Sequence, residues 1–471
     1  FTFIMEYGLK RNYVSSFRLI WQAMGTLSVA ADAAYLLVGV VEFALGATPL
    51  SLFLGVIGYL FIMNTGYQFS KHVNSAGSYY TFAGKGLGGI VGTFQAWNMA
   101  FYGILGYGSF GFLGLASFIT LIDPKYSGAL FWVPIAFVAA LISFLFTYRG
   151  IKISTDYQIA GGVIEVLVLI IGSLIIIINA GKLNTLYVFT LKYVSGYSQL
   201  IFSMIYSTTL YFGTTVSITA LGEEAREPEK NIKRALLATT ILAGLTLIFV
   251  SYAFTIGWGP ANMESFFHSQ DPGVILFKRY SYILYIALIL VTINSFMGYN
   301  ISVSNADSRI FYSFARDGIL FLPNRVAKIH ERYRTPHIAA LIIFILSFLI
   351  AIFFGLRYGP VAGGLLMLLI NSYAAYTEHI VASIALPFLT HRRGEFKLIQ
   401  HVVIPVIGMA ILLIIMISTL ITPEPYPENF AVYFGVSWIP ISGLLTFIEY
   451  KIHPGKVKKA AQFTIEEIEG K

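Results

Sequence analysis

The chain has 471 residues, of which 57% are hydrophobic and only 11% are charged, and its net charge is +8. An ordinary soluble domain carries roughly 25% charged residues, so this composition excludes a large soluble domain and argues against a soluble enzyme. We expect no metal centre and no cofactor, because the chain has no cysteine and its eight histidines form no ligand pair of the metalloprotease type.

Apolar runs long enough to cross a bilayer recur along the whole chain. A membrane-spanning helix needs about 20 mostly apolar residues. Twelve such helices are predicted, at 18–45, 48–69, 87–121, 129–148, 154–180, 199–222, 234–258, 281–315, 337–356, 360–389, 399–421 and 431–450. The remaining segments leave no room for a large soluble domain, and the polar tail from Lys451 to Lys471 is expected to fray.

Lysine and arginine are distributed unevenly between the two sides of this predicted membrane domain. Of the 31 Lys and Arg residues, one side holds only Lys125, Lys182, Lys192, Lys278, Arg279 and Arg357. Cytoplasmic loops are enriched in Lys and Arg. The pattern therefore predicts a multi-pass cell (plasma) membrane protein with residues 1–17 and 451–471 in the cytoplasm and residues 18–450 as one membrane domain. The positive charge then faces anionic membrane lipids rather than nucleic acid, which would require a soluble basic domain.

One loop concentrates charge in this apolar chain. The stretch SITALGEEAREPEKNIKRAL, 217–236, carries acids at its start and bases at its end. From charge alone, the simplest interpretation is a solvated cytoplasmic loop between the sixth and seventh helices.

Three sequence strings carry a resemblance to a known family. GEEAREPEKNIKRAL (222–236) resembles the helix 6–7 junction of amino acid permeases of the amino acid–polyamine–organocation (APC) superfamily. SRIFYSFARDGILFLPNRVAKIHERYRTPHIA (308–339) is similar to their loop after helix 8, and NSAGSYYTFAGKGLGGIVG (74–92) to their entry into helix 3. All three lie at matching places in a twelve-helix plan.

The resemblance implies an all-α, LeuT-like fold with two inverted repeats of five helices. Residues 18–180 would form repeat one, residues 199–389 repeat two, and 399–450 two further helices. Helices 1 and 6 would be broken near the membrane centre, where such folds bind their solute against exposed backbone.

Residues 209–217, TLYFGTTVS, hold the candidate break in helix 6. Gly213 permits backbone angles that other residues avoid, and Thr214 and Thr215 can hydrogen-bond the backbone locally. Tyr211 and Phe212 are candidate pocket aromatics. The alternative is an unbroken helix whose small residues pack against a neighbour.

In helix 1 the expected break falls on Ser28, Val29, Ala30, Ala31 and Asp32. The sequence departs here from the glycine-rich step of the family. A carboxylate in the middle of a bilayer is a functional candidate. Asp32 has three open roles: pairing with the amino group of a substrate, binding a coupling Na⁺ or H⁺, or holding a neighbouring Tyr or Asn.

Three further polar residues at mid-depth complete the candidate site. Glu165, in helix 5, is a candidate proton carrier, or a glutamate hydrogen-bonded to a neighbouring helix. Asn98 and Asn294 are candidates for the pocket wall, although most such residues join helices to one another. On the cytoplasmic side, Glu223 and Glu224 are expected to form a latch with the arginine-rich segment after helix 8, with Arg316 as the partner.

The sequence thus predicts a secondary active transporter that moves amino acids by alternating access, coupled to a proton or Na⁺ gradient, with symport favoured. Its partners would be the solute, the coupling ion and membrane lipids. Two alternatives stay open: a polyamine or organic cation exchanger, and a transporter-like sensor or assembly subunit that moves nothing. The lack of cysteine and the many Ile and Tyr residues are compatible with a heat-loving prokaryote.

Overall fold

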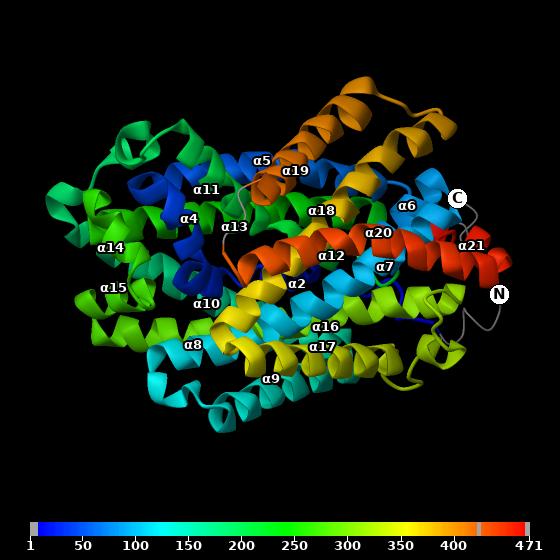
Figure 1. The fold of residues 1–471 in the computed structure, drawn as a ribbon, viewed down its shortest axis with the longest axis horizontal. Coiled ribbons are helices and arrows are strands. Elements are labelled where there is room, and N and C mark those ends of the chain that lie inside the picture. The colour runs from blue at the N-terminus through cyan, green and yellow to red at the C-terminus, as the bar shows by residue number, and fades with distance from the viewer. Residues whose placement is uncertain (1–7, 422–424, 467–471) are drawn as a thin grey trace.

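The computed structural model describes residues 8–421 and 425–466, and within them the chain is a bundle of helices. Figure 1 shows most of them lying roughly along one direction. The α-helices are α2 (Ser16–Leu27), α3 (Val29–Ala31), α4 (Leu37–Ala44), α5 (Thr48–Phe69), α6 (Tyr79–Leu87), α7 (Gly89–Gly106), α8 (Gly114–Ile122), α9 (Ala129–Arg149), α10 (Ile151–Asn179), α11 (Tyr197–Thr209), α12 (Phe212–Thr219), α13 (Pro228–Trp258), α14 (Met263–Phe267), α15 (Pro272–Tyr280), α16 (Tyr282–Asp317), α17 (His337–Tyr358), α18 (Pro360–Arg392), α19 (Ile404–Ile421), α20 (Glu428–Ile452) and α21 (Pro454–Lys459).

Nine helical stretches among the described residues are long and apolar enough to cross a membrane, by length and composition. The first of them, Ser16–Phe69, includes two of the predicted spans. Two other predicted spans do not qualify: 199–222 is split between α11 and α12, and α18 carries Asn371 and Glu378 in its apolar sequence. The all-helical prediction is confirmed for the described residues, whereas twelve spans in a five-plus-five repeat stay a prediction.

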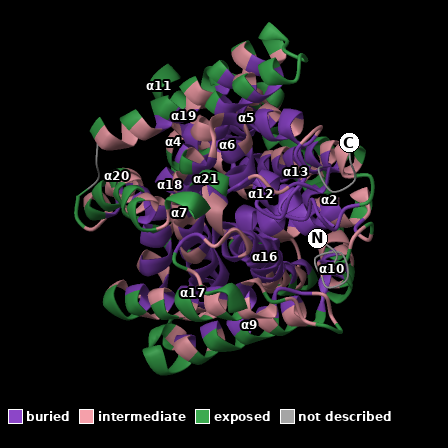
Figure 2. Cartoon of the chain, turned by 90° about the vertical axis from the view of Figure 1, so that its right-hand side faces the viewer, coloured by how far each residue is buried: buried purple, intermediate pink, exposed green. Residues whose placement is uncertain are grey.

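Burial divides the helices into an inner and an outer group. Seen along the bundle in Figure 2, α2, α12 and much of α16 lie in the buried centre, while α9 and α20 lie at the periphery with exposed residues. The exposed side chains of the outer helices are apolar, as with Leu130 of α9, Ile164 of α10 and Phe353 of α17. In water such a surface would drive association, so this belt is suited to lipid.

Two helices are interrupted within their predicted stretches. Between α2 and α3, Ser28 adopts left-handed backbone angles (φ 53°, ψ 55°). The helix then continues through a π-helical segment, η1 (Asp32–Leu36), into α4. Between α11 and α12, Leu210 and Tyr211 leave the regular helix. A second π-helical segment, η3 (Tyr107–Leu113), separates α7 from α8.

The C-terminal tail packs on the rest of the chain, so the expectation that it frays is wrong for residues 451–466. Ala461 is buried and donates its backbone N–H to the Asp317 carboxylate at 2.9 Å. The ring of Phe463 lies 3.6 Å from the Arg316 guanidinium. Residues 467–471 lie outside the described part. Figure 1 places both chain ends at the same end of the bundle.

Candidate functional site

A small cavity lies where the interrupted helices meet α7 and α16. Its volume is about 20 Å³. The lining residues are Thr26, Tyr102, Gly103, Gly106, Gly213, Val216, Ser217, Tyr299, Val303, Ala306 and Asp307. A space of this size holds about one water molecule. A solute larger than water therefore fits this cavity only if the surrounding helices move.

The backbone amides that follow the break in helix 1 are already occupied by the chain itself. A Glu165 carboxylate oxygen accepts the N–H of Ala30 at 2.6 Å and the Ser295 hydroxyl at 2.7 Å. The Ser295 hydroxyl oxygen accepts the N–H of Ala31 at 3.1 Å. Free amides at a helix start are a ready site for an anion. Here the anionic group is an internal side chain.

Ser28 and Asp32 flank these amides. The Ser28 hydroxyl donates to the carbonyl oxygens of Gly25 at 2.9 Å and of Ser295 at 3.2 Å, which fixes the break against α16. Val29 begins α3 and is buried. Asp32 is 3% exposed, and its Oδ2 has no hydrogen-bond partner among the described residues.

The residues at the break in helix 6 lie in two places, one beside the cavity and the other among aromatic rings. Gly213 lines the cavity, next to Thr26. Tyr211 is fully buried and stacks on Tyr59, and its hydroxyl group has no hydrogen-bond partner among the described residues. Phe212 contacts Tyr59, Tyr376 and His379 by its ring.

Thr214 and Thr215 face away from the cavity toward α5. Their hydroxyls meet the Tyr59 hydroxyl at 2.6 and 2.7 Å, respectively. Thr214 also donates to the Tyr211 carbonyl at 2.6 Å, the kind of local bond that competes with a regular helix. These two threonines therefore stabilise the break without lining the space between the helices.

The two predicted wall asparagines lie elsewhere. Asn98 donates to the Phe94 carbonyl and lies 3.5 Å from the Ser442 hydroxyl of α20. Asn294 accepts a hydrogen bond from Tyr157 of α10 at 2.8 Å. Both join helices to one another, and neither is among the residues that line the cavity.

Two buried acids, one of which lines the cavity, were not among the predicted pocket residues. Asp307 lines the cavity, is 4% exposed and has an unpartnered Oδ2. Glu378 of α18 is 1% exposed, and neither of its carboxylate oxygens has a hydrogen-bond partner among the described residues. The signal in the sequence was the spacing of Tyr299, Val303 and Asp307, which places all three on one face of a helix.

The acidic pair after helix 6 makes two separate ion pairs with α16. Glu224 and Arg309 are both completely buried and joined by two hydrogen bonds, at 2.6 and 3.2 Å. Glu223 pairs with Arg316 at 2.8 Å. The Glu224 partner therefore belongs to the helix itself, well before the arginine-rich loop that the sequence suggested. A latch function for these pairs stays a prediction.

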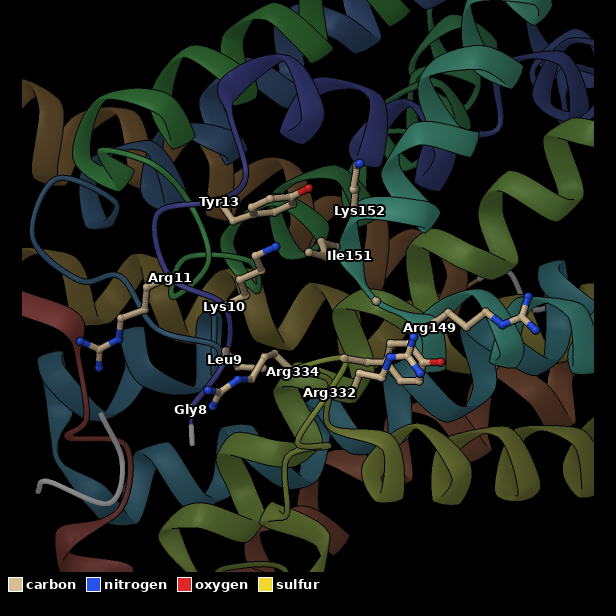
Figure 3. Close-up of a pocket in the computed structure, with 12 residues that line it drawn as sticks. Gly8, Leu9, Lys10, Arg11, Tyr13, Arg149, Ile151, Lys152, Arg332 and Arg334 are labelled. Carbon is tan, nitrogen blue, oxygen red and sulfur yellow. The ribbon is translucent and has the colours of Figure 1, made fainter. Parts of the chain in front are cut away.

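A second hollow, of about 440 Å³, opens at the end of the bundle where the chain begins. Figure 3 shows basic side chains from three segments gathered around it: Lys10, Arg11, Arg149, Lys152, Arg332 and Arg334. No acidic residue is among its described lining residues. This surface is distinct from the central cavity. Of the two hollows, it is the one whose lining carries the positive charge.

Comparison with known proteins agrees with this architecture. A model of the amino acid permease family matches residues 18–463. The low-affinity putrescine importer PlaP of Escherichia coli, in strains K12 and O157:H7, is 25% identical to this chain over 303 residues. That match covers 62% of this chain, and the chain spans 64% of the length of these curated relatives. Because the family model covers nearly the whole described bundle, the resemblance seen in the sequence is confirmed: the chain belongs to the amino acid permease family.

Proposed function

We propose that the chain is a secondary transporter for an organic cation, an amine without a carboxylate, that works by alternating access. One observation carries this proposal. The amides freed by the helix 1 break, which would suit the carboxylate of an amino acid, are held by Glu165 and Ser295 at 2.6 and 3.1 Å. A zwitterionic solute would have to displace the Glu165 carboxyl group to reach them.

The charge of the site supports the same solute class. Asp32 is buried, its Oδ2 is unpartnered, and the residues that line the described cavity include no Lys, Arg or His. A buried carboxylate is costly unless it is paired, and an ammonium group supplies a partner of the right charge. The curated relatives named above are putrescine importers, and putrescine is a carboxylate-free amine.

An amino acid transporter is the second candidate. The family model is described as an amino acid permease, and movement of Glu165 away from Ala30 would open the amide site to a carboxylate. In either case we propose a proton or Na⁺ gradient as the energy source, with Asp32 and Glu165 as the coupling carboxylates. The volume of about 20 Å³ supports alternating access, because this closed conformation must open to admit any solute.

We further propose that the end of the bundle bearing both chain ends faces the cytoplasm of the cell membrane. The cluster of Lys and Arg side chains in Figure 3 lies near the N-terminal end. Cytoplasmic surfaces of membrane proteins are enriched in these residues, which also attract anionic headgroups.

Putrescine and ornithine provide a matched test, since ornithine is putrescine with one added carboxylate. In proteoliposomes containing the purified chain, we expect uptake of labelled putrescine, with ornithine at least about tenfold less effective as a competitor, the size of a lost charged hydrogen bond. Uptake is measured with and without a pH or Na⁺ gradient. Preferred uptake of ornithine would reject the cation proposal in favour of an amino acid transporter. An absence of flux for any solute would favour the non-transporting subunit.

Glu165→Ala tests whether this side chain excludes a solute carboxylate. The substitution frees the N–H of Ala30 and removes the competing negative charge. We expect the putrescine preference over ornithine to shrink by about tenfold or more, since a charge-assisted hydrogen bond contributes about 1.5–3 kcal/mol. The measurement is competition against labelled putrescine. Ser173→Ala, on the same helix and outside the lining of the cavity, serves as the control and should keep the wild-type preference.

A further inference from the structure

We propose that the basic hollow of Figure 3 binds the phosphate group of an anionic lipid at the membrane surface. The hollow has a volume of about 440 Å³, within the range of about 300–1,000 Å³ that is usual for small-ligand sites. Its described lining includes six Lys and Arg residues and no acid. The inference is independent of the solute proposed above, because the hollow is separate from the central cavity.

The hollow is built by three segments whose backbone is held in place by other contacts. The N-terminal segment 8–13 is fastened to the loop after helix 6, where the N–H groups of Tyr13 and Val14 both donate to the Glu224 carbonyl at 2.9 Å. The loop before α17 is fastened to the end of α9, where the Thr335 hydroxyl donates to the Tyr148 carbonyl at 2.9 Å. The backbone that carries the positive charges is therefore fixed at both places.

Most of the positive charge on the hollow is not neutralised by the protein. Four of the six basic side chains form no ion pair in the described part of the chain: Lys10, Arg149, Lys152 and Arg332. The nearby Arg18 differs, since it pairs with Asp156 of α10 at 2.6 Å. Like charges around one hollow repel one another, and an anion between them removes this repulsion. A phosphate group also accepts charge-assisted hydrogen bonds from such side chains.

The start of α10 adds to the positive potential of the hollow. Gly150, the residue before α10, lies in the lining and has no side chain that could accept the amides of the first turn. Its φ of 115° favours glycine, and a Cβ atom there would lie 3.3 Å from the Tyr333 carbonyl oxygen. This 29-residue helix thus begins at the hollow with the positive end of its dipole, which favours an anion.

The position of the hollow favours a lipid as the source of the phosphate. Arg149 ends α9, and Lys152 lies in the first turn of α10. Leu145, one turn before Arg149, is 42% exposed, and Ile153, next to Lys152, is 44% exposed. The basic side chains therefore follow directly on the apolar belt that is suited to lipid. Headgroups lie at this boundary, and basic residues there attract anionic ones.

Binding of three probes to the purified full chain in neutral detergent, measured by calorimetry, tests the site. The probes are dioctanoyl phosphatidic acid, dioctanoyl phosphatidylcholine and pyrophosphate. We expect phosphatidic acid to bind at least about tenfold more tightly than phosphatidylcholine, whose choline group cancels the charge of its phosphate. Pyrophosphate should bind more weakly than phosphatidic acid, because it lacks acyl chains that could contact the apolar belt.

Glutamine variants identify the side chains that hold the phosphate. Arg149→Gln and Arg332→Gln should each weaken phosphatidic acid binding by roughly 10- to 100-fold, as expected for loss of a charged hydrogen bond. Lys152→Gln replaces either variant if it does not fold. Arg357→Gln is the matched control: it removes an arginine from the end of α17, outside the described lining, and should leave binding unchanged.

The possible failures are distinguishable. Equal binding of phosphatidic acid and phosphatidylcholine by the wild-type protein would overturn the phosphate site. Unchanged phosphatidic acid binding in Arg149→Gln and Arg332→Gln, or an equal loss in Arg357→Gln, would do the same. Tight binding of pyrophosphate without binding of either lipid would overturn the lipid and assign the hollow to a soluble phosphate compound. None of these results bears on the solute, which putrescine and ornithine test separately.

Discussion

Asp32→Asn should reduce amine uptake by at least about 30-fold. The substitution keeps the size of the side chain and removes the negative charge at the break in helix 1, where Oδ2 is buried and unpartnered. Removing one member of a buried charged pair costs about 2–5 kcal/mol, and 1.4 kcal/mol corresponds to a tenfold change. The measurement is initial uptake of labelled putrescine into proteoliposomes that contain equal amounts of folded protein.

Asp32→Glu separates charge from geometry in this experiment. It restores the carboxylate at a slightly different position and should recover part of the uptake. If Asp32→Asn transports putrescine at the wild-type rate, Asp32 holds neighbouring side chains and does not bind the solute or the coupling ion.

Glu224→Gln should destabilise the folded protein by about 3–5 kcal/mol, because it leaves Arg309 buried without its counter-charge. The two side chains are completely buried and joined at 2.6 and 3.2 Å. The expected loss is large because a guanidinium in this position can reach neither water nor another acid at bonding distance in the described structure. The readout is the melting temperature of detergent-purified protein.

Two matched variants define the origin of this effect. Glu227→Gln removes an acid from an exposed pair with Lys230 in the same loop and should leave the melting temperature unchanged. Exchanging the charges, with Glu224→Arg and Arg309→Glu together, should recover part of the stability lost by either change alone. An unchanged melting temperature in Glu224→Gln would show that the pair does not stabilise the fold.

The sequence predicted the helices because they depend on local composition, whereas the breaks in helices 1 and 6 were implied by the resemblance to the permease family. Long apolar runs define spans whatever their neighbours are. The structure interrupts the first helix at Ser28 and the sixth at Leu210 and Tyr211, within the predicted stretch 209–217, whereas Gly213 itself lies inside α12. Helix starts were less accurate: α13 begins at Pro228, six positions before the predicted start at 234, because proline is well suited to the first turn of a helix.

The composition of the site was harder to predict, because it depends on how each helix is rotated about its axis. Asn98 and Asn294 have the polarity expected of a pocket wall, yet they face α20 and α10. Asp307 and Arg309 are separated by one residue of α16, yet Asp307 lines the cavity and Arg309 pairs with Glu224. Neighbouring residues of α16 thus have different roles, one in an ion pair and one in the cavity lining. This difference follows from the packing of α16 against α7 and could not be seen in the sequence.

The π-helical turn at Asp32–Leu36 has a consequence for the register of the chain. A π turn contains one residue more than an α turn, so it behaves as a one-residue insertion in an otherwise regular helix. Every side chain beyond Leu36 is thereby rotated by about 100° relative to an uninterrupted α-helix. This offset determines which face of α4 meets α11 and α14. Removing a single alanine at 33 or 34 should therefore convert the π turn into a regular α turn and keep the same face of α4 against α11 and α14.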